Sequence, residues 1–96
     1  MKKFYHATPF SNLDGILTKG ILKGCDGVVY LAETPDAACK FIAIRCFEPI
    51  LVVEAELDEA LVEESFDHNF AFFKERAWVY PKDIDPDQLG RMWKYE

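Results

Sequence analysis

Two spacings of apolar residues alternate along this chain of 96 residues. In some segments every second position is apolar, which is typical of a half-buried strand. In others apolar residues recur every three or four positions, as they do on one face of a helix. Single Pro and Gly residues separate the segments, without a repeat, a low-complexity tract or a linker. The pattern predicts one α+β domain over residues 1–96.

Two strands are predicted in the first third of the chain. Residues 3–8 alternate polar and apolar side chains before a loop at Pro9, which puts His6 near the end of the first strand. Residues 28–31 are a short β-branched and aromatic run that carries Tyr30.

A central strand is predicted later in the chain, at residues 49–57. It begins as a continuous apolar run and ends in alternation, so we expect it to emerge into solvent with Glu54 and Glu56 on its outer face. Two more strands are expected at residues 78–80 and 91–95, with a turn or a single helical turn at residues 85–87.

Two helices are predicted from their start signals. The first opens at Ser11, has Asp14 three residues later as an approximate capping box, and stops at Gly20. The residues expected on its inward face are Leu13, Ile16 and Leu17. The second helix has Thr34 at its N-cap and Pro35 at its first helical position.

Acidic residues outnumber basic ones, seventeen Asp and Glu against eleven Lys and Arg, which gives a net charge of −6. Eight of the acids lie between Cys46 and Phe73, a stretch without Lys or Arg, and predict one acidic surface. They are Glu48, Glu54, Glu56, Asp58, Glu59, Glu63, Glu64 and Asp67. Since this charge repels phosphate backbones, nucleic acid is disfavoured as a partner.

The three cysteines, Cys25, Cys39 and Cys46, are an odd number in a chain that opens without an apolar signal segment. We therefore expect reduced thiols and a cytoplasmic location, with Cys39 and Cys46 as small core residues on one face of the second helix. Neither CxxC nor HxxxH occurs and His6 is far from His68, so no metal is expected. No apolar run approaches the ~20 residues of a membrane span, so no membrane partner is expected.

Simple catalytic motifs are absent, since the sequence has no GxSxG and no Gly-rich phosphate loop. What remains is His6, Tyr30 and Glu75, each near the end of a different predicted strand. Each also has an ordinary structural interpretation. His6 can be a half-buried histidine bonded to the backbone, Tyr30 a packing residue, and Glu75 a solvated charge at a strand edge.

Residues 5–8, 16–21 and 29–35 resemble the opening of small ADP-ribosyltransferase-like domains. Glu75, before residues 78–84, resembles the segment in which that superfamily presents its catalytic glutamate. The likeness is to the branch of diphtheria toxin and the poly-ADP-ribose polymerases, which uses a histidine, a tyrosine and a glutamate. It implies a minimal α+β fold with small split antiparallel or mixed sheets, two short helices and an NAD cleft between the sheets.

The resemblance also implies a role for each candidate residue. His6 would bond a ribose hydroxyl of NAD, Tyr30 would stack on the nicotinamide ring, and the Ala7 main chain would hold the carboxamide. Thr8 would add a hydroxyl contact. Glu75 would hold the 2′-hydroxyl of the nicotinamide ribose and stabilise the positive charge that develops as nicotinamide leaves.

The implied activity is transfer of ADP-ribose from NAD, without a metal, to a protein or small-molecule acceptor. Residues 66–74 would recognise the acceptor through an apolar surface formed by Phe70, Phe72 and Phe73, although a Phe cluster of this kind is more often part core and part loop anchor. Two alternatives stay open. One is a non-catalytic interaction domain on the same scaffold, including a homodimer. The other is an RNA 2′-phosphotransferase-like activity on the same scaffold. It would need several positive side chains around the phosphates, and Arg45 and Arg76 are the only central arginines.

Overall fold

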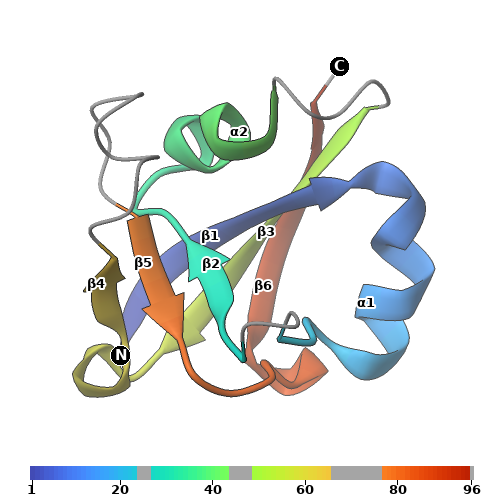
Figure 1. Cartoon of the computed structure of the whole chain (residues 1–96). Coiled ribbons are helices and arrows are strands. Elements are labelled where there is room, and N and C mark those ends of the chain that lie inside the picture. Colours follow the sequence, from blue (N-terminus) through green and yellow to red (C-terminus); the bar gives the residue numbers. More distant parts are fainter. Residues whose placement is uncertain (24–26, 44–48, 66–76, 96) are drawn as a thin grey trace.

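Two sheets of three antiparallel strands make up the β-structure of the computed structural model, which describes residues 1–23, 27–43, 49–65 and 77–95 (Figure 1). The first sheet has the order β1-β3-β6, with β1 at Lys2–Pro9, β3 at Ile50–Leu57 and β6 at Leu89–Tyr95. The second has the order β2-β5-β4, with β2 at Val29–Leu31, β5 at Ala77–Tyr80 and β4 at Glu63–Ser65. The α+β class and the five predicted strands are confirmed.

Two short helices accompany the sheets, α1 at Leu13–Lys19 and α2 at Pro35–Ala43, and lie at different sides of the molecule (Figure 1). Three single helical turns lie at Phe10–Asn12, Glu59–Leu61 and Pro86–Gln88. The predicted start of α2 is confirmed, because the Thr34 Oγ1 accepts a hydrogen bond from the Ala37 N–H at 3.1 Å.

The start of α1 differs from the prediction at Ser11. The chain first makes a helical turn after β1, because the Phe10 N–H donates to the Pro49 carbonyl at 2.8 Å and the Asn12 amide donates to Thr8 Oγ1 at 2.7 Å. The helix proper then begins at Leu13, and its cap residue makes no side-chain cap bond. The predicted stop is confirmed: Gly20 follows the helix with φ at 81°.

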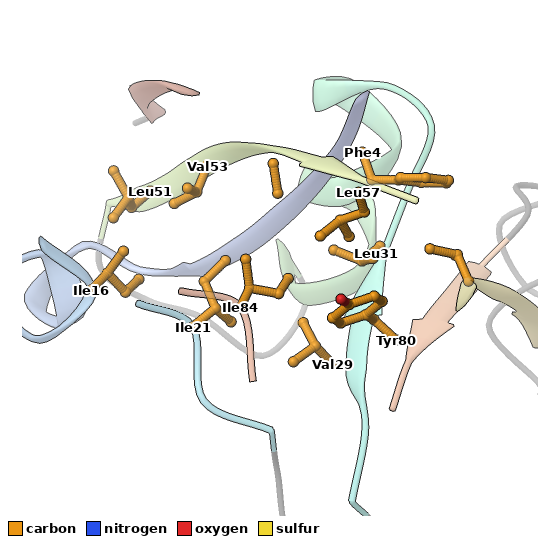
Figure 2. Close-up of a cluster of buried hydrophobic side chains, with 12 residues drawn as sticks. Phe4, Ile16, Ile21, Val29, Leu31, Leu51, Val53, Leu57, Tyr80 and Ile84 are labelled. Atoms are coloured by element: carbon orange, nitrogen blue, oxygen red, sulfur yellow. The ribbon is translucent and has the colours of Figure 1, made fainter. Parts of the chain in front are cut away.

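The main core fills the space between the two sheets and α1 (Figure 2). The first sheet contributes Phe4, Leu51, Val53 and Leu57, the second contributes Val29, Leu31 and Tyr80, and α1 contributes Ile16. Ile21 and Ile84 also belong to this core and exchange two main-chain hydrogen bonds of 2.8 Å. Those bonds tie the segment after α1 to the segment after β5.

A second apolar cluster lies between α2 and the first sheet, and its residues are small: Ala7, Ala32, Ala37, Ala38 and Val52. Such residues allow a helix to approach a sheet closely. Cys39 is half-buried and packs against this cluster, whereas Cys25 and Cys46 lie outside the described residues.

Two predicted side-chain orientations are wrong. Leu17 is 56% exposed because α1 is only seven residues long and turns Ile16 to the core instead. Glu54 is buried at 8% exposure, where Tyr5 Oη donates to its Oε2 at 3.5 Å and Lys3 Nζ lies 3.8 Å from its Oε1. Gly90 makes room for this carboxylate, since a Cβ there would lie 2.6 Å from Oε1. The acidic surface therefore excludes Glu54.

Candidate functional site

Among the described residues, an isolated main-chain bridge joins the two sheets, between Tyr5 of β1 and Ala32 just after β2. The Tyr5 N–H donates to the Ala32 carbonyl at 2.9 Å, and the Ala32 N–H donates back to the Tyr5 carbonyl at 2.8 Å. The bridge brings the next residue of β1, His6, beside β2. There His6 Nδ1 lies 2.8 Å from the main-chain oxygen of Tyr30.

The protonation state of His6 follows from that contact. A carbonyl oxygen can only accept a hydrogen bond, so Nδ1 carries the proton and donates it to Tyr30. Burial lowers the pKa of His6 below 6.5, and the bond to Tyr30 offsets only part of this decrease. At neutral pH the ring is therefore neutral, and Nε2 has a lone pair that can accept a hydrogen bond.

The Ala7 main chain lies at the edge of the first sheet, on the side of β1 away from β3, and the residue is 8% exposed. Along an antiparallel strand, the N–H and C=O of one residue point to one side and those of the next residue to the other. Tyr5 directs both groups toward Ala32, so Ala7, two residues on, directs both groups to the same side, away from β3. Because β1 is an edge strand of its sheet, no other described strand pairs with Ala7 there.

A pocket of about 350 Å³ opens beside His6, between β1 and α1. Its polar lining consists of His6, Thr8, Asn12 and Lys19. The remaining lining residues are Gly15, Ile16, Gly20, Ile21 and Leu22. Thr8 and His6 share this face of β1, whereas the Ala7 side chain packs on the other face with the α2 cluster.

Tyr30 is directed away from the main core. Its neighbours in β2, Val29 and Leu31, are buried, while the Tyr30 side chain is 41% exposed. An exposed phenol ring on a short strand offers a flat apolar face to a planar ligand. Tyr30 therefore contacts His6 through its carbonyl, while the residue is 41% exposed.

Four predicted site residues, Glu75, Phe70, Phe72 and Phe73, lie outside the described residues. Glu75 stands two positions before β5, which pairs with β2 and sets Val79 opposite Tyr30. The start of β5 is anchored by Trp78, whose Nε1–H donates to Glu33 Oε1 at 2.9 Å.

Sequence reasoning missed Asn12 and Lys19 as lining residues of the pocket. A polar residue before a helix and a lysine in its last turn are common end signals, so neither residue type distinguishes a ligand contact from helix capping. Within the part of the chain that the structure describes, no three His, Cys, Asp or Glu residues gather as a metal site.

No protein-family model matches the chain, and no curated protein resembles it in sequence. Among the described helices, none has the length and apolar character required to cross a bilayer.

Proposed function

We propose that the chain is an ADP-ribosyltransferase-like domain that binds NAD where its two sheets meet and transfers ADP-ribose to a protein or small-molecule acceptor. The main support is the edge of β1 at Ala7, where one N–H donor and one C=O acceptor are directed away from β3 and pair with no other described strand. A primary carboxamide has the complementary pair, a carbonyl that accepts and an amino group that donates. The nicotinamide carboxamide can therefore form the two hydrogen bonds to Ala7 that the main chain of a further strand would form.

Two neighbouring residues match other parts of the nicotinamide riboside half of NAD. The Tyr30 ring is accessible for stacking on the pyridinium ring. His6 is held by the Tyr30 carbonyl in the tautomer whose Nε2 accepts a proton from a hydroxyl, which suits a ribose hydroxyl. A protonated imidazole would lack this acceptor, so the lowered pKa of His6 favours the binding-competent form.

In the proposed reaction, the bond between nicotinamide nitrogen and ribose C1′ breaks and its electron pair leaves with nicotinamide. C1′ becomes positively charged and is attacked by the acceptor nucleophile, which loses a proton to solvent. The products are ADP-ribosyl acceptor, nicotinamide and one proton. We assign Glu75 to the 2′-hydroxyl of that ribose, where its negative charge stabilises the cationic transition state.

The test is a calorimetric titration of the folded chain with NAD. We expect saturable binding that weakens at least about tenfold in His6→Ala, because the ribose hydroxyl loses its acceptor. Leu61→Ala, a change at an exposed side chain outside the candidate site, is the control and should bind as the unmodified chain does. No binding at millimolar NAD would contradict the proposal and favour the non-catalytic interaction domain.

A further inference from the structure

We infer that the pocket between β1 and α1 binds a phosphorylated sugar, with Lys19 as the residue that takes the phosphate. That this sugar phosphate is part of NAD rests on the proposed function. That the pocket binds a sugar phosphate at all follows from its lining residues alone. The chain carries six more negative than positive charges, yet the residues that line this pocket include a lysine and no carboxylate.

Two side chains of the pocket are hydrogen-bond donors for an anion. The Thr8 hydroxyl accepts from the Asn12 amide at 2.7 Å and keeps its own proton to donate. Lys19 lines the same pocket, and no ion pair joins it to a carboxylate of the described residues. An ammonium group and a hydroxyl donor are suited to phosphate oxygens.

His6, another polar residue of the lining, has the opposite preference. His6 donates through Nδ1 to the Tyr30 carbonyl, so its Nε2 is an acceptor and matches a sugar hydroxyl rather than a phosphate. A ligand that bonds both to His6 and to the donors Lys19 and Thr8 must carry a hydroxyl and an anionic oxygen a few atoms apart. A sugar phosphate has this combination, whereas inorganic phosphate has only the anionic part.

The space available fits one sugar phosphate. The volume of about 350 Å³ lies at the lower end of the range for small-molecule sites, roughly 300–1,000 Å³. Gly15 adds to this space: it lies inside α1, where glycine weakens a helix, and a Cβ placed on it would meet no atom within 4 Å. Packing within the protein thus gives no reason for glycine at this position.

The experiment is an NMR titration with ribose 5-phosphate and, separately, with ribose. We expect ribose 5-phosphate to shift the amide signals of Thr8, Gly15 and Lys19 saturably and more tightly than ribose does. Lys19→Gln should weaken ribose 5-phosphate binding at least about tenfold, the usual effect of losing a bond to a charged group. Lys23→Gln is the matched control, because Lys23 is an exposed lysine outside the pocket lining.

A second variant tests whether the ligand occupies the space beside Gly15, independently of the charge of Lys19. Gly15→Leu should keep the helix and lose ribose 5-phosphate binding, because the new side chain occupies the pocket. Unchanged binding in Lys19→Gln, or no saturable shift in the unmodified chain, would overturn the inference.

NAD distinguishes this inference from the proposed function. If ribose 5-phosphate binds through Lys19 and NAD does not bind, the proposed function fails and the pocket stands. If NAD binds equally well to the chain and to Lys19→Gln, the pocket assignment fails and the proposed function stands.

Discussion

At the scale of single residues, His6 of the first sheet is hydrogen-bonded through its ring to the main chain of the second sheet. One ring nitrogen is committed to the Tyr30 carbonyl, and this bond determines that the other nitrogen is an acceptor. Because burial disfavours the charged form of the ring, protonating His6 lowers the free energy of unfolding.

The stability of the protein should therefore fall in mildly acidic solution. The pKa of His6 is lowered in the folded state below 6.5, so the unfolded chain takes up a proton first as the pH decreases. The contribution of His6 is complete above pH 6.5 and is lost as the pH falls toward the lower folded pKa. We expect urea unfolding to show a decrease in the free energy of unfolding from about pH 7.5 to about pH 5.5 that is smaller in His6→Gln. Equal decreases in the unmodified chain and in His6→Gln would contradict the account.

Tyr30 provides a second prediction at this scale. If its ring stacks on nicotinamide, Tyr30→Ala should weaken NAD binding by a factor on the order of five, equivalent to about 1 kcal/mol, while Tyr30→Phe keeps the affinity. Leu61→Ala, at 40% exposure against 41% for Tyr30, is the control for removing an exposed apolar side chain. Calorimetry on the three variants decides, and a Tyr30→Ala chain that binds NAD normally would make Tyr30 a packing residue.

At the scale of elements, the position of α1 depends on how the helix ends. Gly20 has φ at 81°, and a Cβ there would collide with the main-chain oxygen of Ile84. The next residue, Ile21, exchanges its main-chain hydrogen bonds with Ile84. The end of α1, which forms one wall of the pocket, is thus held against the segment after β5.

Gly20→Ala should consequently destabilise the protein by about 1–3 kcal/mol, since alanine resists this backbone conformation and its methyl group has no room. Gly15→Ala is the matched control within the same helix. It should stabilise the protein by about 0.5–1 kcal/mol, because a helical conformation suits alanine better and the added Cβ meets nothing. Thermal unfolding measures both, and a Gly20→Ala chain as stable as the unmodified one would refute the role given to this glycine.

Most elements could be predicted from the sequence because their signals are local. The alternation in β1, the apolar run of β3 and the Thr34-Pro35 start of α2 each lie within a few neighbouring residues. The strand β4 was missed, because Glu63–Ser65 shows no apolar alternation and is a strand only through its pairing with β5. The burial of Glu54 was missed for a similar reason: its space comes from Gly90, thirty-six positions away in the sequence.

At the scale of the whole molecule, the candidate site exists only because two sheets are joined at one edge. The sequence could indicate His6 and Tyr30 as separate candidates, but the bond between them depends on the Tyr5–Ala32 bridge. The pocket with Lys19 likewise requires the placement of α1 against β1. Long-range pairing of this kind leaves no pattern in a single segment.

The proposed reaction makes a prediction for the complete chain. Glu75→Gln should abolish ADP-ribose transfer and NAD hydrolysis, since the amide cannot offer the negative charge that the transition state needs. The melting temperature should change by no more than a few degrees, because replacing a carboxylate by an amide of the same size ordinarily has little effect on folding. Glu63→Gln, at an exposed acid of β4, is the matched control. Equal activity in the unmodified chain and Glu75→Gln would remove Glu75 from the mechanism.

The central claim is that the edge of β1 at Ala7 binds the nicotinamide end of NAD, and the amide proton of Ala7 reports on it most directly. In a ¹⁵N-labelled sample titrated with NAD, we predict a saturable downfield shift of the Ala7 N–H as it donates to the carboxamide oxygen. The signal of Glu63, in the strand β4, should stay in place. Saturable NAD binding without a shift at Ala7, or no binding at all, would contradict the account.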